Sequence, residues 1–485
     1  MEPQKKGRIP VTLLSIVTLV LLCAPQHIFG LLMDCERFQS ISPPVFFIAI
    51  QMIMQPCLGE SEDGIIRAFL STGSLALSFG IIFASVSEII LQEKTLLFSL
   101  LYGALGGIGA FLVTTIIRRF LNRFFEENNA NLIEVIESTS LALSQLLFPF
   151  LVMQMRMFYG ADMALLFLGA ILLHILPLGL ILSHSRLQVQ MHNLGRHQSV
   201  TPNDLKTPQN GMRRWGNMTG INNHHLADDY ELPLKNITSQ GVEIMDTIPE
   251  EDEGISGKSI DIPDIKLRQF HTRKYYFLFE YCQESRRILS ELFVNPFRSI
   301  IKRQILFPGV ILRACDMLIY TLMVSGLPCL VTGEKYRLSL VESSILLSLM
   351  ALPIILIALT SAWMEDVLCE KSKYWHISGE ISKLVGCIII TSSHTIFFLR
   401  MGVLCLGAGQ GLFIILQERI IREIVDEDNW RLTRSHISAV SGYLLLILGF
   451  FTNHLIAIVE FSTIFLVTGL FYSAAIFSFI LTTYF

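Results

Sequence analysis

One polar stretch of this sequence occurs twice. Arg118–Leu132 reads RRFLNRFFEENNANL, and Glu418–Leu432, which begins three hundred residues later, reads ERIIREIVDEDNWRL. Four of the fifteen aligned pairs are identical, among them Arg119 with Arg419. Such a repeat predicts that the two stretches occupy the same place in two related halves of the chain.

The composition is that of a membrane protein. Hydrophobic residues make up 52% of the 485 residues and charged residues only 16%, whereas a soluble domain usually carries about 25% charged residues. The formal net charge of −4 gives no electrostatic basis for a nucleic-acid partner. The nine cysteines are scattered without a Cys-x-x-Cys pair, so no disulfide framework is indicated.

A membrane-spanning helix needs about 20 mostly apolar residues, and twelve runs of the sequence are candidates. The predicted spans are residues 11–32, 43–58, 68–90, 96–117, 131–153, 162–182, 305–331, 340–363, 378–398, 400–417, 435–455 and 460–482. Six lie on each side of a polar stretch. We therefore expect three parts, namely an N-terminal six-helix bundle at 1–183, a central loop at 184–304 and a C-terminal six-helix bundle at 305–485.

The central loop is acidic and rich in turn residues, and we expect it to be largely disordered. An amphipathic pattern just before the seventh span predicts a helix lying along the inner membrane face. If the N-terminus is cytosolic, fourteen Lys and Arg residues fall in cytosolic loops, Lys383 among them, against six outside. Because positive residues are enriched on the cytoplasmic side, we expect both termini and the central loop in the cytosol.

The spans that precede the two repeated stretches are also alike. YGALGGIGAFLV at Tyr102–Val113 and MGVLCLGAGQGLFI at Met401–Ile414 both carry glycines near helical spacing, which permit close helix contact. A duplicated six-helix unit joined by a cytosolic loop is the plan of many secondary transporters. The expected fold is therefore an all-α polytopic membrane protein of two pseudo-symmetric six-helix bundles.

The loop between the second and third spans supports this plan. Its sequence GESEDGIIR resembles the signature G-x-x-x-D-x-x-G-R of the major facilitator superfamily, with Gly59, Asp63 and Arg67 at matching positions. Ile66 replaces the second glycine. The equivalent loop of the second half, AWMED, keeps only Asp366.

Within that superfamily, the chain resembles a divergent member of the monocarboxylate transporter family. The first span ends in IFGLLM, similar to the family's F-G-V-F-F, and the stretch from the fourth to the sixth span follows the family's layout. The resemblance covers all twelve spans but not the central loop. It implies transport of a small organic anion such as a monocarboxylate, coupled to protons or facilitative, in the plasma membrane. For some family members it also implies a single-span accessory protein.

Several charged positions of that family are changed in this chain. The aspartate and arginine usual in the eighth span fall on Ile354 and Ala358, and the lysine that some members carry in the first span falls on Gln26 or His27. These losses favour a rival interpretation, in which the solute is a neutral or zwitterionic metabolite.

Charged residues at the cytosolic ends of the spans are candidates for a conformational latch that joins neighbouring helix ends in one state of the transport cycle. The alternative is that they only anchor these loops on the cytosolic side. The candidates are Asp63, Arg67, Arg119, Glu127, Asp366, Arg419 and Glu427.

Ionisable residues inside the spans are candidates for substrate binding, because a charge in the hydrocarbon core is costly unless it faces protein, a partner or water. Arg313 lies in the seventh span, and Asp316 follows at i+3 on the same helix face. Arg313 could hold a carboxylate through two hydrogen bonds, with Asp316 orienting it or taking up a proton. The alternative is a permanent ion pair that stabilises helix packing.

Three more polar residues are substrate-site candidates. Gln26 and His27 lie in the outer part of the first span, where His27 could relay protons and Gln26 could donate a hydrogen bond to a carboxylate. Gln410 lies in the glycine-rich tenth span. The alternative for His27 is a hydrogen-bonded packing residue.

No pattern of catalytic or metal-binding residues stands out, so we expect neither enzyme activity nor a cofactor. The expected function is secondary transport of a small organic anion by alternating access, with the solute, protons and the lipid bilayer as partners. Besides the neutral-solute alternative, a non-transporting membrane scaffold or sensor that signals through the central loop stays open.

Overall fold

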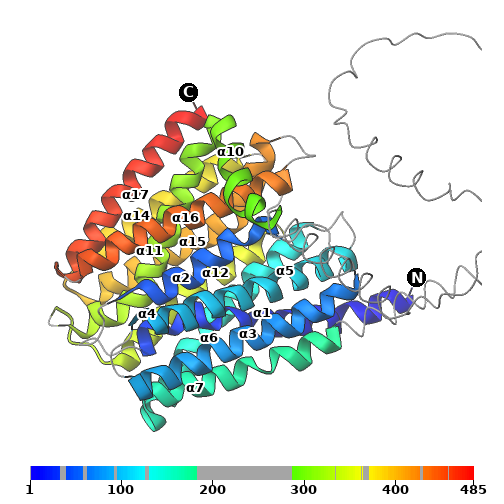
Figure 1. The fold of residues 1–485 in the computed structure, drawn as a ribbon. Coiled ribbons are helices and arrows are strands. Elements are labelled where there is room, and N and C mark those ends of the chain that lie inside the picture. The colour runs from blue at the N-terminus through cyan, green and yellow to red at the C-terminus, as the bar shows by residue number, and fades with distance from the viewer. Residues whose placement is uncertain are drawn as a thin grey trace, which may run out of the picture. The chain divides into compact units, whose positions relative to one another are not determined.

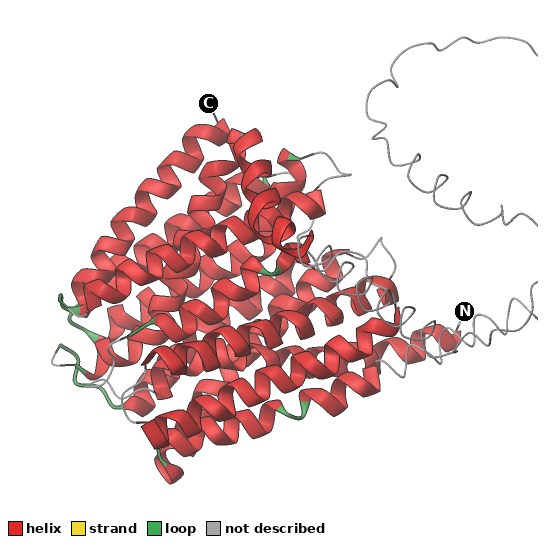
Figure 2. Ribbon diagram, viewed as in Figure 1, coloured by secondary structure: helices red, strands yellow, loops and turns green. Residues whose placement is uncertain are grey.

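The computed structural model is built from helices (Figures 1 and 2). It describes residues 2–32, 40–57, 63–91, 95–125, 130–182, 287–333, 335–361, 363, 371–425, 430–456 and 458–484. No strand occurs in these ranges. The predicted all-α class is confirmed, while most of the predicted central loop lies outside the described residues.

Helical spans correspond one to one to the twelve predicted runs. The first half contains α1 (Glu2–Leu32), α2 (Ser42–Ile53), α3 (Asp63–Leu91), the combined span α4 (Thr95–Phe98), a π-helical turn (Ser99–Leu105) and α5 (Gly106–Phe125), then α6 (Ala130–Tyr159) and α7 (Ala161–Leu172). The second half contains α11 (Phe307–Thr332), α12 (Leu340–Ser361), α14 (Ser372–Ser392), α15 (Ile396–Ile424), α16 (Trp430–Ile456) and α17 (Phe461–Tyr484). Ten of the spans are long and apolar enough to cross a membrane by composition alone.

Helix α14 begins six residues before the predicted ninth span. The predicted span at 378–398 already contains Glu380 and Lys383, although the count of cytosolic positive residues also includes Lys383. Both residues are buried inside the bundle, with exposed fractions of 1%. Lys383 therefore belongs to a spanning helix, not to a cytosolic loop, and the positive-residue count on that side falls from fourteen to thirteen.

The 300-residue offset between the two repeated stretches also separates the starts of equivalent helices. α6 begins at Ala130 and α16 at Trp430, while α7 begins at Ala161 and α17 at Phe461. The halves therefore share not only the number of helices but also the register of the chain. Figure 1 shows the blue helix α2 of the first half lying beside the orange helix α16 of the second.

Glycines at equivalent positions make equivalent helix contacts. A Cβ at Gly107 would meet the Phe47 backbone oxygen of α2, and one at Gly407 would clash with the backbone of α12, the matching helix of the second half. Gly109 likewise lies against the backbone of α3, and Gly409 against that of α14. Such approaches require a residue without a side chain. The predicted role of these glycines in helix contact accordingly recurs in both halves.

The two halves meet through two equivalent helix pairs. α2 packs against α16, where a Cβ added at Gly442 would lie 2.8 Å from the Ala49 backbone oxygen. α6 packs against α12, where the Ser348 hydroxyl donates to the Leu146 backbone oxygen at 2.9 Å. Since α2 matches α12 and α16 matches α6, these contacts are related by the same pseudo-two-fold relation as the halves.

A further helical segment precedes α11, in the stretch with the amphipathic pattern. A π-helical turn at Ser290–Val294 leads into α10 (Asn295–Lys302), which packs against α16. The Tyr443 ring of α16 lies 5.5 Å from the rings of Phe293 and Phe297. The segment is thus joined to the second half through aromatic contacts.

Candidate functional site

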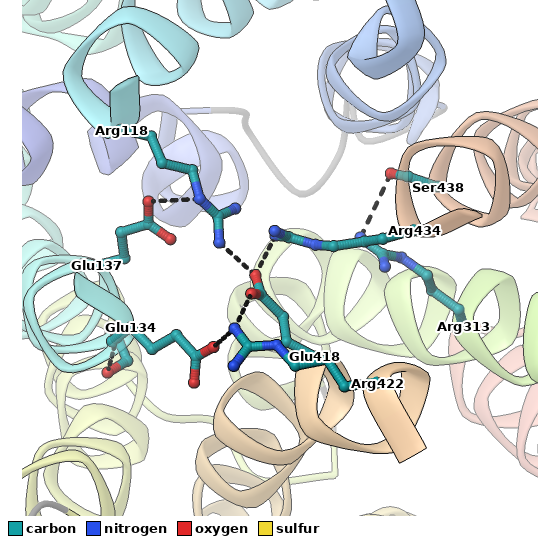
Figure 3. A network of polar contacts seen from close by, with 9 residues as sticks. Arg118, Glu134, Glu137, Arg313, Glu418, Arg422, Arg434 and Ser438 are labelled. Atoms are coloured by element: carbon teal, nitrogen blue, oxygen red, sulfur yellow. Dashed lines mark hydrogen bonds and ion pairs between the residues drawn. The ribbon is translucent and has the colours of Figure 1, made fainter. Parts of the chain in front are cut away.

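A network of arginines and glutamates joins the two halves where α5 and α15 end (Figure 3). Arg118 of α5 donates to the Glu418 carboxylate of α15 at 2.5 Å and lies 3.4 Å from Glu137 of α6. Arg118 and Glu418 are equivalent residues of the repeated stretch. The repeat therefore brings its own two copies into contact.

A second ion pair also connects the halves. Arg422 of α15 lies 3.2 Å from the Glu134 carboxylate of α6 and 3.8 Å from Glu418 on its own helix. Arg434 of α16 contacts Glu418 as well. Glu418 is thus surrounded by three arginines, and with only 9% of its side chain exposed it depends on them for charge compensation.

A cavity of about 320 Å³ opens beside this network. Its lining comes from α2, α5 and α6 of the first half and from α15 and α16 of the second, so it lies between the halves. The charged residues in its lining are Arg118, Arg119, Arg422, Arg431, Arg434, Glu134 and Glu418. Arginines outnumber glutamates there, so the described lining is basic.

Arg313 lies next to the network on α11 and is buried. Its Nη2 donates to the Ser438 hydroxyl of α16 at 3.4 Å. No carboxylate among the described residues forms an ion pair with Arg313. Asp316, predicted to face it, instead contacts Lys383 of α14. Among the described residues, Arg313 is therefore a buried cation that hydrogen-bonds to a neutral side chain and to no carboxylate.

Deeper between the halves, three neutral polar side chains form a chain of hydrogen bonds. The Tyr320 hydroxyl of α11 lies 2.7 Å from His27 Nδ1 of α1 and donates to Gln145 Oε1 of α6 at 3.2 Å. The Gln145 amide in turn donates to the Leu347 backbone oxygen of α12 at 3.5 Å. His27 and Gln145 are fully buried. This polar triad of His27, Gln145 and Tyr320 links four helices from both halves.

Tyr320 follows Arg313 by two helical turns on α11, so the two side chains project from nearly the same face. At Tyr320 this face contacts α1 of the first half, whereas Arg313 contacts Ser438 of α16 beside the network.

The other predicted site residues are distributed as follows. Gln26 is half-buried on α1, and Gln410 is buried on α15. Arg119 lines the cavity, and Arg419 is buried within electrostatic range of Glu134. Arg67 is exposed near the start of α3.

Four of the predicted latch residues cannot be placed at the level of side chains. Asp63 begins α3, but its side chain is not among those described. Glu127, Asp366 and Glu427 lie outside the described residues. Their role stays a prediction.

Several residues in this region were not singled out from the sequence. Glu418, Arg118 and Arg434 of the network, and Tyr320 and Gln145 of the polar triad, belong to this group. One signal was present, because the repeat aligns Arg118 with Glu418 and so pairs opposite charges at one position. Tyrosine and glutamine in apolar spans give no comparable signal, since neither interrupts the hydropathy pattern.

The described residues contain no group of three or more His, Cys, Asp or Glu side chains arranged to hold a metal ion. The side chains between the halves include arginines, carboxylates and neutral hydrogen-bonding groups. Such groups can bind and orient a solute.

Comparison with known proteins yields similarity of structure only. No family model matches the sequence, and no curated protein matches it. Among solved structures, the nucleoside transporter NupG matches with a TM-score of 0.56 and 10% identity, covering 99% of each chain. A POT family transporter in complex with a thioalcohol-conjugated peptide matches with a TM-score of 0.54 and 13% identity, covering 99% of this chain and 96% of that one.

The xylose transporter XylE from E. coli, in a partially occluded inward open conformation, matches with a TM-score of 0.53 and 10% identity over 97% of this chain and 98% of that one. These identities are low, so the likeness establishes the fold. The chain is a multi-pass membrane protein with the fold of the major facilitator superfamily.

Proposed function

We propose that this protein is a secondary transporter that moves a small organic anion, such as a monocarboxylate, by alternating access. The observation that carries the proposal is Arg313, a buried cation without a carboxylate partner among the described residues, next to the network whose arginines and glutamates line a cavity between the halves. The fold supports it as well, because two six-helix bundles around a central site suit an alternating-access mechanism.

Arg313 is the residue to which we assign anion binding. Its guanidinium presents several donors in one plane and can hold both oxygens of a carboxylate. The hydroxyl of Ser438, at 3.4 Å, occupies little of that capacity. A carboxylate reaching Arg313 from the cavity would compensate a charge that the helices leave without an ion pair.

The polar triad would receive the rest of the solute. The Tyr320 hydroxyl hydrogen-bonds to both His27 and Gln145 between the halves. When the halves separate on that side, the same donors and acceptors become available to a hydroxyl, carbonyl or carboxylate of the solute. Gln26 and Gln410, predicted from the sequence, are assigned supporting roles here.

The interbundle ion pairs would act as the gate. Arg118 with Glu418, and Arg422 with Glu134, tie helix ends of opposite halves at the side where the cavity opens. Rocking of the halves must break and remake these pairs. Of the predicted latch set, Arg119 and Arg419 are close enough to take part, and Asp63, Arg67, Glu127, Asp366 and Glu427 remain proposed members.

A second candidate solute is a neutral or zwitterionic metabolite. The polar triad favours it, since all three of its side chains are uncharged hydrogen-bonding groups. In that case Arg313 would serve the gate rather than the solute. The two candidates differ in what loss of the Arg313 charge should do.

The decisive experiment is flux into proteoliposomes that hold the purified full-length protein. Labelled lactate, an amino acid and an uncharged sugar are compared, each with and without a pH gradient. Anion flux should fall by about 10- to 100-fold in Arg313→Gln, as expected for loss of a charged hydrogen bond worth about 1.5–3 kcal/mol. Arg400→Gln, at an exposed arginine of the same half, should leave flux unchanged.

Unchanged anion flux in Arg313→Gln would remove the proposed binding site. Flux of the sugar or the amino acid alone would favour the second candidate, and no flux for any solute would favour the scaffold or sensor. We also propose a plasma-membrane location with cytosolic termini, and a single-span accessory protein as a partner. Surface labelling with and without co-expressed candidates tests both.

A further inference from the structure

A second charged cluster lies inside the C-terminal half. Lys383 of α14 contacts the Asp316 carboxylate of α11, and its Nζ lies 3.8 Å from Glu380 Oε2 on α14. The Tyr472 hydroxyl of α17 donates to Glu380 and lies 3.4 Å from Asp316 Oδ1. None of these four residues is more than 1% exposed. The anion-binding and gating roles proposed above leave all four of them without a function.

The charges of this cluster do not balance. Two carboxylates share one ammonium, so ionisation of both acids leaves one negative charge away from water. Such a charge is costly in a membrane protein unless it is compensated. Arg313, one turn before Asp316, is directed to Ser438 of α16 and forms no ion pair with either acid. One additional proton would make the cluster neutral.

The geometry favours Glu380 as the residue that holds this proton. Asp316 takes the direct contact with Lys383, whereas Glu380 is farther from that ammonium. Glu380 Oε1 has no hydrogen-bond partner in the structure, although it is fully buried. It faces His376 Nε2 at 3.5 Å, one helical turn nearer the start of α14. A proton on Oε1 would be placed to move to that imidazole.

The remaining neighbours are apolar or neutral. On α15, Lys383 Nζ lies 4.1 Å from the centre of the Phe413 ring, and the missing side chain of Gly409 leaves room for the lysine stem. On α17, the Phe479 ring lies 5.6 Å from that of His376. Cys387 follows Lys383 by one turn on α14 and is buried. No further carboxylate or cation among the described residues reaches ion-pair distance of the cluster.

We propose that Asp316, His376, Glu380 and Lys383, with Tyr472, form a proton-binding site within the C-terminal half. One exchangeable proton resides on the Glu380 carboxyl. On release it passes from Glu380 Oε1 to His376 Nε2 and on to the aqueous side. Glu380 is then a carboxylate held by Lys383 and the Tyr472 hydroxyl. If the protein is the transporter proposed above, this is the site of the coupling proton.

Infrared difference spectroscopy of the full-length protein in nanodiscs tests the site without any solute. Spectra are compared between acidic and alkaline buffer. The wild type should show a buried carboxylic acid band that is lost as the pH rises, and this band should be absent in Glu380→Gln. The band should persist in Glu460→Gln, at an exposed acid of the same half.

A second variant guards against misfolding of Glu380→Gln. Lys383→Gln removes the ammonium, so both acids must then be protonated to reach neutrality, and the carboxylic acid band should grow. An unchanged band in both variants would overturn the proposal. An imidazolium band in place of the carboxylic acid band would overturn the assignment of the proton to Glu380.

The consequence for transport is measured separately in proteoliposomes. Glu380→Gln should abolish accumulation of the solute driven by a pH gradient while leaving solute exchange without a gradient intact. Failure of exchange in the wild type would contradict the proposed function but not the proton site. Gradient-driven accumulation that survives in Glu380→Gln would contradict the coupling role alone.

Discussion

Arg118 and Glu418 occupy the same position of the two repeated stretches, and their side chains meet at a distance of 2.5 Å between Nη2 and Oε1. Equivalent positions of two halves can touch only near the axis that relates them. Identical arginines there would repel each other. Because this position carries an arginine in one half and a glutamate in the other, the two side chains attract each other and form an ion pair that joins the halves (Figure 3).

The network predicts an asymmetry between its two central residues. The Glu418 carboxylate compensates the charges of three arginines, Arg118, Arg422 and Arg434. If Arg118 is removed, the other two arginines still compensate the charge of Glu418. Glu418→Ala should lower the free energy of unfolding by about 3 kcal/mol, and Arg118→Ala by less. Denaturant unfolding of both variants and of the double variant measures their coupling. Glu460→Ala, at an exposed acid, serves as the control, and equal losses in all three single variants would contradict this account.

The polar triad predicts a cost for the loss of one hydroxyl. Tyr320→Phe leaves His27 Nδ1 and Gln145 Oε1 without the partner they share, which should cost about 1–3 kcal/mol of stability. Tyr443→Phe is a matched control, since that half-buried tyrosine only donates to the Leu292 backbone oxygen at 3.4 Å. Thermal unfolding in detergent compares the two variants. Equal stability of both would show that the triad contributes nothing.

The fold was predictable from the sequence because apolar runs and repeats are properties of the chain itself. The buried charges of α14 show where this reasoning ends, since Lys383 and Glu380 meet partners on other helices, Asp316 and Tyr472. The partners depend on how each helix is rotated about its axis. Arg313 and Asp316 lie only three residues apart, yet one faces α16 and the other α14. Spacing alone could not separate these directions.

The predicted orientation can be tested at two loops that flank α12. Arg337 lies in the turn between α11 and α12, which we expect outside the cell, and Lys371 lies just before α14, which we expect in the cytosol. In a background without reactive cysteines, Arg337→Cys should react with a membrane-impermeant maleimide on intact cells. Lys371→Cys should react only after permeabilisation. The reverse pattern would invert the topology and place the cavity on the outer side.

Glycines at equivalent positions of the two halves predict that stability depends on the space available for a side chain at each position. A Cβ at Gly409 would clash with the backbone of α14 and with the Lys383 side chain, whereas one at Gly469 on α17 meets nothing within 4 Å. Gly409→Ala should therefore lower stability by about 1–3 kcal/mol through forced separation of α14 and α15. Gly469→Ala should raise it slightly, by about 0.5–1 kcal/mol, because alanine favours the helix. Denaturant unfolding measures both. Gly409 also adjoins Lys383, so Gly409→Ala should shift the charged cluster and weaken the carboxylic acid band of Glu380. An unchanged band together with unchanged stability would show that α14 and α15 are not closely packed there.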